Sequence, residues 1–521
     1  MICLSVTGGT VAENIRLIRP YLSKIDAIEF RADRLDSASV EPISSFPEHL
    51  RAALPGVREL SGGVILTVRR TRDGGSWQNG EQRRLEVIAE SLRAGYSHVD
   101  LEIDLEESEA GRALAAEARA AGVRVIRSLH DFTGITSDPA EAIARLCARP
   151  GEIGKLAVTP RSTADLARLI DAALDTAARE KIVLGMGEYG FPTRVLAPRL
   201  GCYLSFVSSP GHSAAPGHID PATMVEVYRY RDVSRGTAVF AVIGNPVMHS
   251  RSPNYHNRRF SDDRLDAVYV PIQVDRIEDF WTVARSLEIL GVSVTIPHKQ
   301  AVLPRLAQTD GDVRTTRACN TLVRLPLTET QQGGTQSGGS HLESSPRWAG
   351  FNTDIAGFLS PLRTITGRKV AGMRASVIGA GGAARAVCAA LRSEGAGVCV
   401  LNRTVERADA LKREFDLAAS GGLDAGGMDL LRRYSDIIVQ TTSVGMEPLE
   451  DDDPIPEFSF AGHEIVYDIV YTPEITKMLG RARRAGCPIV TGRTMFEKQA
   501  EAQYALFSGV LSEFTRGRDR F

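Results

Sequence analysis

The chain has 521 residues, of which 43% are hydrophobic and 24% are charged, and its formal net charge is −2. This length predicts roughly two to four domains with large cores, and the balanced charge argues against a nucleic-acid-binding or membrane-binding surface. The seven cysteines are scattered without a Cys-x-x-Cys pair, which disfavours a zinc site and predicts reduced thiols in the cytoplasm. No stretch approaches the roughly 18 apolar residues of a membrane-spanning helix, and the N-terminal "MICLSVTGG" is typical of a strand rather than a signal peptide.

Eight apolar, strand-like segments recur through residues 1–210, and helical patterns separate most of them. The segments begin at residues 2, 27, 64, 98, 123, 154, 181 and 203. Such alternation over about 200 residues predicts a (β/α)₈ barrel, with an open, doubly wound sheet as the alternative. A helix over 221–232 closes this half, and the polar "VSRG" at 233–236 is typical of a short hinge.

A lysine interrupts the apolar strand in "GEIGKLAVTP", residues 151–160. Because side chains alternate along a strand, Lys155, Ala157 and Thr159 share one face, which in a barrel is the interior. Burial among apolar neighbours favours the neutral amine, and such an amine can condense with a ketone to form a Schiff base. The alternative is a lysine at a strand end that extends into water.

Charged residues also lie at the carboxyl ends of several other predicted strands, or just beyond them. In a barrel the carboxyl ends of the strands meet at one face, where barrel enzymes hold their sites. This clustering favours the catalytic interpretation of Lys155. The residues are Glu29, Arg31, Arg69, Asp73, Asp100, Glu102, His130 and Arg194.

With these residues, positions 1–225 resemble type I 3-dehydroquinate dehydratase. The resemblance implies that Lys155 forms an imine with the substrate's ring ketone, and that His130 removes the adjacent proton and later helps water leave. The family carries glutamate at Asp73 to orient the histidine, and glutamine at His218 in the closing loop, so this chain departs from the pattern twice. The implied substrate-binding residues are Ser5, Glu29, Arg31, Arg69, Arg194 and Ser213.

The second half begins with the strand-like "AVFAVIGNP" at 238–246, and the Gly/Ser-rich stretch 326–346 is expected to form a surface loop. Further on, "VIGAGGAARA" places Gly379, Gly381 and Gly382 between a strand and a helix. Small residues there let the backbone approach a pyrophosphate at a helix N-terminus, which predicts a dinucleotide site. A tight glycine turn without a ligand is the alternative.

The strand that follows this turn ends at Asn402, Arg403 and Thr404. A site selective for NAD usually has an acidic residue at this point, whereas Arg403, with Arg407 one turn later, suits the 2′-phosphate of NADP. The sequence therefore predicts NADP as the cofactor. The alternative for Arg407 is an ordinary solvated helix residue.

Five further motifs surround the glycine-rich turn: "HSRSP", "SVTIPHK", "CNTLV", "GFNTD" and "GRTMFEKQAEAQ". Together the six motifs resemble shikimate dehydrogenase over residues 237–521. The resemblance implies that Lys299 and Asp354 form the catalytic pair, in which an ammonium beside the developing alkoxide supplies the proton. One departure is Ser293, where the family usually has asparagine.

The resemblance also implies two sets of binding residues in this half. The substrate carboxylate would be held by Ser250 and Ser252, and its hydroxyl groups by residues that include Asp354. Those hydroxyl-binding residues are Thr295, Asn320, Asp354, Tyr471 and Gln499. The cofactor-binding residues are Gly379, Ala380, Gly381, Gly382, Ala383, Asn402, Arg403, Thr404, Arg407, Ile469 and Gly492.

The whole chain therefore resembles the bifunctional family that joins these two enzymes. We expect an α/β protein with an N-terminal (β/α)₈ TIM barrel at 1–232, an α/β substrate-binding domain at 237–364 completed by a C-terminal helix at 496–521, and a Rossmann NADP domain at 365–495. The implied activity dehydrates 3-dehydroquinate to 3-dehydroshikimate and reduces the latter to shikimate with NADPH. We expect no metal, nucleic-acid or membrane partner, and the sequence leaves a homodimer open.

Two other functions compete with this interpretation. The second half could be a quinate-type dehydrogenase, although Ser250 and Ser252 favour shikimate. A non-catalytic, metabolite-sensing regulator is the other alternative. The chain keeps Lys155 and Lys299, which such a sensor could lose, and it has no DNA-binding motif.

Overall fold

The computed structural model describes residues 1–36, 40–176, 180–212, 215–326, 346–367 and 369–518. It forms two compact units, Met1–Ile289 and Leu290–Phe521, here called the first and the second unit. Ser213 and almost all of the Gly/Ser-rich stretch at 326–346 lie outside the described residues. Among the described residues, no helix is both long and apolar enough to cross a membrane.

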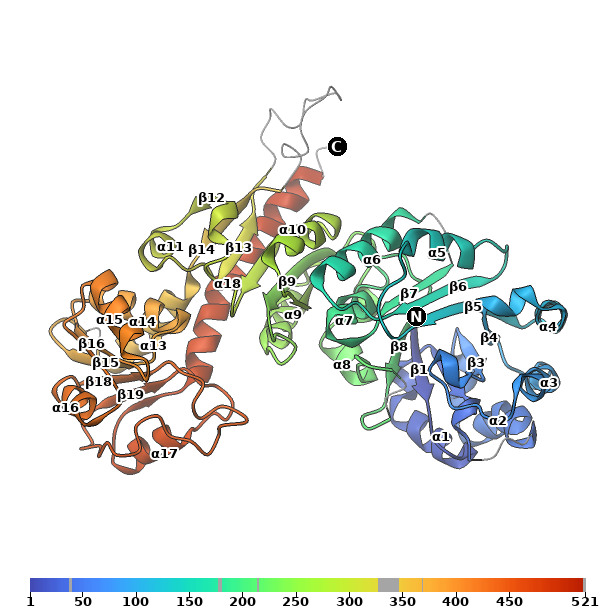
Figure 1. The fold of residues 1–521 in the computed structure, drawn as a ribbon, viewed down its shortest axis with the longest axis horizontal. Coiled ribbons are helices and arrows are strands. Elements are labelled where there is room, and N and C mark those ends of the chain that lie inside the picture. The colour runs from blue at the N-terminus through green and yellow to red at the C-terminus, as the bar shows by residue number, and fades with distance from the viewer. Residues whose placement is uncertain (37–39, 177–179, 213–214, 327–345, 368, 519–521) are drawn as a thin grey trace, which may run out of the picture. The chain divides into compact units, whose positions relative to one another are not determined.

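Eight parallel strands of the first unit form a nearly closed barrel (Figure 1). Their order is β7-β6-β5-β4-β3-β2-β1-β8, and the two end strands approach each other where the Tyr203 amide donates to the Lys181 carbonyl at 2.7 Å. The open, doubly wound alternative is therefore wrong, and the predicted barrel is confirmed. The strands are β1 (Ile2–Val6), β2 (Ala27–Arg31), β3 (Gly63–Thr67), β4 (His98–Glu102), β5 (Arg124–Asp131), β6 (Ile153–Val158), β7 (Lys181–Gly185) and β8 (Ser205–Ser208).

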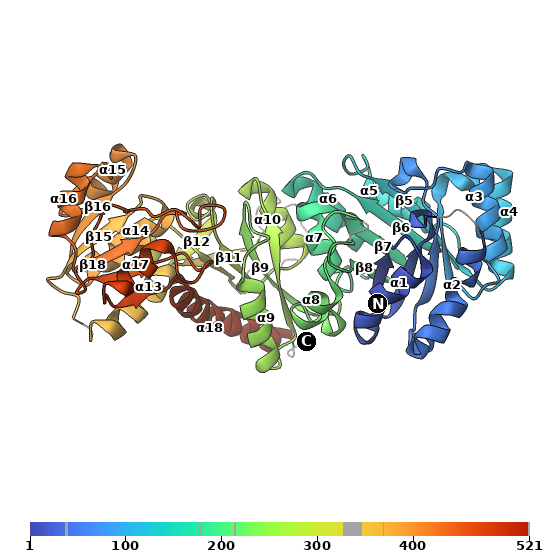
Figure 2. The ribbon, with the colours of Figure 1, turned by 90° about the horizontal axis from the view of Figure 1, so that it is seen from below.

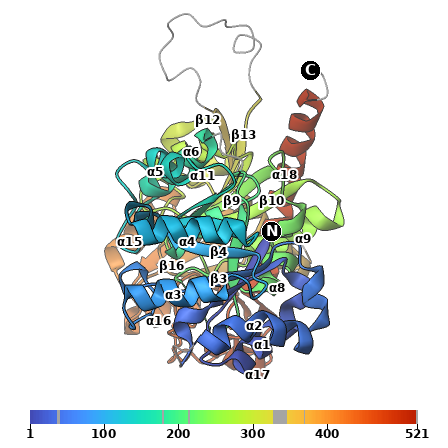
Figure 3. The same cartoon turned by 90° about the vertical axis from the view of Figure 1, so that its right-hand side faces the viewer.

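Helices cover the outside of the barrel, as Figure 3 shows for α3 and α4. In α6, the Ser162 side chain caps the N-terminus by accepting from the Asp165 amide, and Leu166, Leu169 and Ile170 are buried at helical spacing. The helices are α1 (Val11–Ile18), α2 (Val40–Ala53), α3 (Glu81–Ser91), α4 (Glu109–Ala120), α5 (Pro139–Leu146), α6 (Thr163–Asp175), α7 (Gly187–Val195) and α8 (Pro221–Glu226). Short 3₁₀ helices occupy Arg19–Lys24, Ala32–Arg34, Pro55–Glu59, Thr71–Asp73, Ile103–Glu107 and Tyr230–Asp232.

The first unit continues beyond the barrel with two parallel strands and two helices. These are β9 (Ala238–Gly244), α9 (Ser252–Asp262), β10 (Ala267–Gln273) and α10 (Ile277–Ser286). Within this unit, the Thr163 amide and hydroxyl at the start of α6 donate to Asp275, just after β10, at 2.9 and 2.5 Å. A carboxylate at a helix N-terminus stabilises the helix, so this contact joins the segment to the barrel.

The second unit opens with four short strands, in which β13 pairs antiparallel with β11 and β14, and β12 pairs parallel with β14. They are β11 (Gly291–Val294), β12 (Leu306–Thr309), β13 (Thr321–Arg324) and β14 (Trp348–Phe351). The helices among and after them are the 3₁₀ helix Leu303–Arg305, α11 (Gly311–Thr316) and α13 (Thr353–Ile365).

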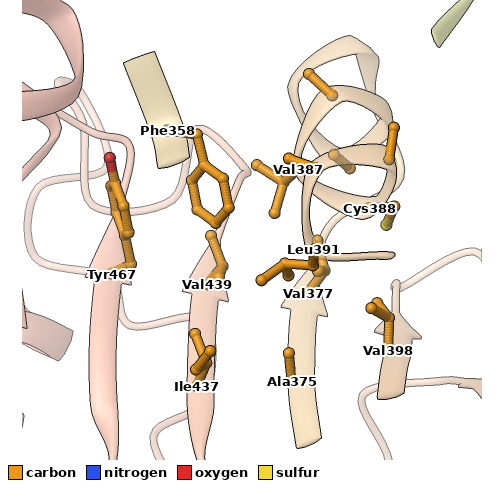
Figure 4. Packing of buried hydrophobic residues seen from close by; sticks show 14 of the residues in the cluster. Phe358, Ala375, Val377, Val387, Cys388, Leu391, Val398, Ile437, Val439 and Tyr467 are labelled. Atoms are coloured by element: carbon orange, nitrogen blue, oxygen red, sulfur yellow. The ribbon is translucent and has the colours of Figure 1, made fainter. Parts of the chain in front are cut away.

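A six-stranded parallel sheet follows, in the order β17-β16-β15-β18-β19-β20. Figure 4 shows part of its core, in which Val377 of β15 and Val439 of β18 pack near Val387 and Leu391 of α14 and Phe358 of α13. This arrangement confirms the predicted Rossmann fold. The strands are β15 (Arg374–Ile378), β16 (Gly397–Leu401), β17 (Ala419–Gly421), β18 (Ile437–Gln440), β19 (Ile465–Asp468) and β20 (Ile489–Val490), and the helices are α14 (Gly382–Ser393), α15 (Val405–Phe415), α16 (Ala425–Arg433) and α17 (Lys477–Arg484).

The last helix, α18 (Gly492–Arg518), is the long dark red helix of Figure 2 and packs along α13. It begins at Gly492, before the expected start at 496. A β-carbon at Gly492 would lie 2.3 Å from the Ile469 carbonyl oxygen, so only glycine fits this close approach of helix and loop.

Candidate active sites

Strand β6 carries Lys155 into the interior of the barrel, as the strand alternation predicts. Its side chain is buried, and Nζ donates to Asp100 Oδ2 at 2.9 Å. Nζ also lies 3.6 Å from Glu29 Oε1 and 4.3 Å from the centre of the Phe206 ring. The lysine therefore points away from bulk water and lies among charged groups.

The surroundings of Lys155 differ from the apolar environment that its own strand suggested. Asp100 comes from β4 and Glu29 from β2, and both carboxylates are buried. Burial alone would raise the pKa of Asp100, but Arg69 and Lys155 hold it well below its usual range. A carboxylate this close stabilises a positive charge on Lys155 and would do the same for an iminium ion.

Arg69 ties the carboxylates of β4 together. Its guanidinium lies 2.7 Å from Asp100 and 3.2 Å from Glu102, and it also donates to Ser128 Oγ at 2.9 Å. Because Arg69 is buried and makes charge-assisted bonds in several directions, its position is strongly determined. On the other side of Lys155, the Ser5 hydroxyl donates to Glu29 Oε2 at 2.5 Å.

His130, at the end of β5, lies in the same cavity as Lys155. Burial lowers the pKa of His130 well below its usual range, and the cations Arg69 and Lys155 lower it further. Its Nδ1 is buried and has no hydrogen-bond partner among the described residues. The imidazole is therefore neutral near pH 7, and a neutral imidazole can accept a proton.

Asp73 does not orient His130 in this structure. Its carboxylate instead accepts from Arg70 Nε at 2.6 Å, and within the described ranges no hydrogen bond joins it to His130. Asp73 still lines the cavity. An aspartate extends less far than the glutamate usual in the family, and Arg70, three residues earlier, lies within its reach.

The barrel cavity brings together the predicted residues of this half that the structure describes. Arg194 is fully buried, burial lowers its pKa to about 10, and its guanidinium donates to the Pro216 carbonyl at 3.3 Å. Phe206 and His218 also line the cavity, and the sequence assigned neither a role. The predicted residues in its lining are Ser5, Glu29, Arg31, Arg69, His130, Lys155 and Arg194.

The second unit holds the other predicted pair. Lys299 Nζ donates to Asp354 Oδ2 at 2.6 Å, and Asn320 Nδ2 donates to Asp354 Oδ1 at 2.7 Å. Asp354 lies in the first turn of α13, where the side chain of Asn352 caps the helix by accepting from the Asp354 amide at 3.1 Å. Asn320 and Lys299 thus hold the two carboxylate oxygens, and the helix cap holds the backbone of the same residue.

Gln503 of α18 is a buried residue that the sequence reasoning missed. It donates to Thr321 Oγ1 at 2.9 Å and to the Asn320 carbonyl at 3.2 Å, and it accepts from Ser293 Oγ at 2.9 Å. Ser293, the departure from the family pattern, is therefore hydrogen-bonded despite its short side chain. Gln503 lies four residues after the predicted Gln499 on the same helix face, and that spacing could have revealed it.

The other substrate-binding residues predicted for the dehydrogenase half are divided between the two units. Thr295, Tyr471 and Gln499 are half-buried in the second unit, where the Tyr471 ring packs 5.7 Å from the Phe496 ring. Ser250 and Ser252 belong to the first unit and form the turn that opens α9, in which the Ser252 amide donates to Ser250 Oγ at 3.2 Å.

Comparison with known proteins matches both halves of the chain. The family model for type I 3-dehydroquinase matches residues 2–235, that for the shikimate dehydrogenase substrate-binding domain matches 242–322, and that for shikimate/quinate 5-dehydrogenase matches 362–460. The bifunctional 3-dehydroquinate dehydratase/shikimate dehydrogenase of Arabidopsis thaliana chloroplasts is 30% identical over 531 residues, covering 98% of this chain and 82% of the relative. The chain belongs to the bifunctional 3-dehydroquinate dehydratase/shikimate dehydrogenase family.

Other similar proteins match either the dehydrogenase half of the chain or nearly all of it. The shikimate dehydrogenase (NADP+) of Methanopyrus kandleri is 37% identical over 286 residues, which cover 53% of this chain and 92% of that protein. The solved dehydroquinate dehydratase and shikimate dehydrogenase from S. pombe shares 21% identity, covers 98% of this chain and 97% of its own, and has a TM-score of 0.40.

The dehydrogenase half has a glycine-rich turn whose shape fits a dinucleotide. Gly379 adopts φ +112°, a left-handed conformation that other residues rarely adopt. Beside it, Gly381 and Gly382 are exposed, and a β-carbon on Gly381 would meet no atom within 4 Å. This open backbone leads into α14, whose first N–H groups have no side-chain cap and suit a pyrophosphate.

The two predicted phosphate-binding arginines follow β16, whose last residue, Leu401, accepts from the Gly379 amide of this turn at 2.7 Å. Arg403 and Arg407 are exposed, and within the described part of the chain neither side chain makes an ion pair or hydrogen bond. Asn402 closes the strand end by donating to the Thr404 carbonyl at 2.8 Å. Both guanidinium groups are therefore accessible to an anionic ligand.

Proposed function

We propose that this chain catalyses two successive reactions, the dehydration of 3-dehydroquinate to 3-dehydroshikimate and the NADPH-dependent reduction of that ketone to shikimate. The observation that carries the first step is the buried amine of Lys155 in one cavity with the neutral imidazole of His130. The membership of a bifunctional family supports the second step, together with the Lys299–Asp354 pair beside a dinucleotide turn.

In the barrel, the ammonium group of Lys155 first gives one proton to His130, and the free amine attacks the ring ketone. The resulting carbinolamine takes that proton back and loses its hydroxyl as water, which leaves an iminium ion and a neutral His130. The iminium withdraws electrons, so the adjacent C–H becomes acidic and His130 takes its proton. The enamine then expels the ring hydroxyl, which leaves as water with the proton from His130. Hydrolysis of the remaining imine releases 3-dehydroshikimate and restores Lys155, while Asp100 stabilises each positive charge on its nitrogen.

The substrate carboxylate needs cationic donors that the protein has not already satisfied. Arg194 Nε is buried without a hydrogen-bond partner among the described residues, so it offers an N–H to the cavity. Arg69 is already bonded to Asp100 and Glu102. We therefore assign the carboxylate chiefly to Arg194. Arg31 is itself paired with Asp33 at 2.8 Å, so we give it a secondary part, and we assign the hydroxyl groups to Ser5 and Glu29.

In the dehydrogenase half, bound NADPH supplies the hydride. Lys299 holds the proton that the developing alkoxide takes, and Asp354 keeps the ammonium in place at 2.6 Å. Asn320 orients Asp354, and Gln503 in turn holds the backbone of Asn320. We propose that Ser250 and Ser252 bind the carboxylate, and that Thr295, Tyr471 and Gln499 bind the hydroxyl groups.

A coupled assay tests the whole proposal. The full chain supplied with 3-dehydroquinate and NADPH should produce shikimate with matching consumption of NADPH. In the reverse direction, oxidation of shikimate with NADP+ should be faster than oxidation of quinate or turnover with NAD+. Absence of shikimate would contradict the proposal, and a preference for quinate would favour the quinate-type alternative.

We further propose a cytoplasmic location, because all seven cysteines are free thiols. A homodimer stays a prediction, which analytical ultracentrifugation of the full chain would test.

A further inference from the structure

Arg385 makes contacts on two sides of the nucleotide-binding helix α14. On one side it forms a bidentate ion pair with Glu414, with Nη1 at 2.8 Å from Oε2, and lies 5.3 Å from the Phe415 ring centre, both on α15. On the other side, Nε donates to the Thr316 carbonyl at 3.1 Å, at the end of α11. The Arg385 side chain is only 12% exposed, so these contacts determine its position.

Thr316 continues the connection toward the catalytic pair. It is fully buried, and its Oγ1 accepts from Asn352 Nδ2 at 2.9 Å. Asn352 is the cap of α13 and accepts from the Asp354 amide at 3.1 Å. The guanidinium of Arg385 also lies at the C-terminus of α11, where backbone carbonyls carry partial negative charge and a cation is stabilising.

The N-terminus of α14, one turn before Arg385, lies near Lys299. This helix begins at Gly382, and a β-carbon there would lie 4.0 Å from Lys299 Cδ. Arg385, three residues later, thus holds the helix that presents the dinucleotide turn to the catalytic lysine. Hydride and proton must reach two atoms of one carbonyl group, which demands that the turn and the Lys299–Asp354 pair keep a fixed separation.

We propose that Arg385 is a positioning residue of the reductase, which fixes the dinucleotide turn relative to Lys299 and Asp354 through the Thr316 carbonyl. Arg385 touches none of the proposed reacting groups itself. The inference rests on the proposed reduction, and it assigns a role to an arginine outside the predicted phosphate-binding pair Arg403 and Arg407.

Arg385→Ala in the full chain tests this role. We expect kcat for 3-dehydroshikimate reduction to fall about 10- to 100-fold, because small misplacements of reacting groups have effects of that size. The NADPH dissociation constant, measured by nucleotide fluorescence, should change less than about threefold, because Arg385 binds a carbonyl and not the cofactor. The primary isotope effect with deuterated NADPH should rise, because hydride transfer becomes slower.

Amide hydrogen exchange without cofactor gives a second readout. We expect faster exchange in the turn 379–385 and in 311–316, and no change in the barrel. An unchanged kcat, an unchanged isotope effect, or a loss of NADPH affinity that accounts for the rate would each overturn the inference.

Three further variants separate the Thr316 contact from the ion pair. Glu414→Gln removes the ion pair but keeps the Thr316 contact. Its kcat for 3-dehydroshikimate reduction should stay within about threefold of the wild-type value. Arg392 lies on α14 like Arg385 and makes an exposed ion pair with Asp416, which follows α15. Arg392→Ala breaks that pair and should leave kcat and the isotope effect unchanged. Arg385→Lys keeps a charged donor that can reach the Thr316 carbonyl, so it should recover part of the rate.

These variants also decide the case in which Arg385→Ala does not fold. A Glu414→Gln protein whose kcat falls by about 10-fold or more would overturn the role of the Thr316 contact, because that variant keeps this contact. An Arg385→Lys protein with no reductase activity and unchanged hydrogen exchange would overturn it too. Failure of the wild-type chain to reduce 3-dehydroshikimate would instead reject the proposed function itself.

Discussion

His130 illustrates how a single residue acquires its chemistry from its surroundings. In water an imidazole is half protonated near pH 6.5, but burial and the cations Arg69 and Lys155 lower the pKa of His130 well below that value. A base works in its unprotonated form. The structure therefore keeps His130 ready to accept a proton in mildly acidic solution.

We predict that kcat/KM for dehydration stays nearly constant as the pH falls from 7.5 to 6, and declines only at lower pH. A pH profile at constant ionic strength measures this. His218→Gln serves as a control, because burial also lowers the pKa of that second imidazole in the cavity. A half-maximal rate near pH 6.5 in both proteins would show that His130 titrates as an ordinary histidine.

Arg403 is the residue on which cofactor choice is predicted to depend. Replacing it with alanine removes a guanidinium that would pair with the 2′-phosphate, so KM for NADPH should rise about 10-fold or more. KM for NADH should change little, because NADH lacks that phosphate. Arg413→Ala, which removes an exposed arginine from α15, is the matched control. Equal effects on both cofactors would remove the phosphate role from Arg403.

At the scale of an element, β19 ends in a buried carboxyl group that organises the loop leading to α17. Asp468 is fully buried, accepts from the Val470 amide at 2.9 Å and from Thr476 Oγ1 at 2.7 Å, and has a pKa raised to about 7, chiefly by burial. Its ordinary pKa is 3.8. The folded state thus binds a proton that the unfolded chain has lost between about pH 4 and pH 7.

We predict that this group stabilises the fold most below pH 4, and that its contribution is lost as the pH rises through about 7. The effect is at most about 4 kcal/mol, from a difference of about three pKa units. Asp468→Asn keeps one acceptor and one donor, so its thermal midpoint should depend less on pH between 5 and 8 than that of wild type. Calorimetry at several pH values measures this, and parallel curves for the two proteins would contradict it.

At the scale of the whole molecule, we propose that the two lysines serve two separate reactions. Lys155 lies in the first unit and Lys299 in the second, each with its own carboxylate partner. A lysine that forms a covalent intermediate cannot be replaced by solvent, and neither can a positioned proton donor.

We predict that Lys155→Ala loses dehydration by about 10³-fold or more while shikimate oxidation persists, and that Lys299→Ala shows the reverse. Borohydride with 3-dehydroquinate should add mass to wild type and Lys299→Ala but not to Lys155→Ala. A mixture of the two variants should regain the conversion of 3-dehydroquinate to shikimate, because free 3-dehydroshikimate links them. Loss of both activities in either single variant would show that the sites are not independent.

The local pattern of the sequence determined a large part of this protein. The alternation of strands and helices located all eight barrel strands, since buried strands and amphipathic helices each leave a distinct periodicity. The same alternation placed Lys155 inside the barrel, and the glycine-rich turn before α14 was evident because few residues other than glycine fit it. The resemblance of its motifs to those of two enzyme families indicated both activities.

Only the tertiary structure decided which distant side chains meet. It placed Asp100 beside Lys155, gave Asp73 to Arg70 instead of His130, and brought Gln503 to Asn320 and Arg385 to Thr316. Periodicity within a segment says which face a residue occupies. It does not say which residue of another segment lies opposite, because that depends on strand register and on how helices pack across the whole core.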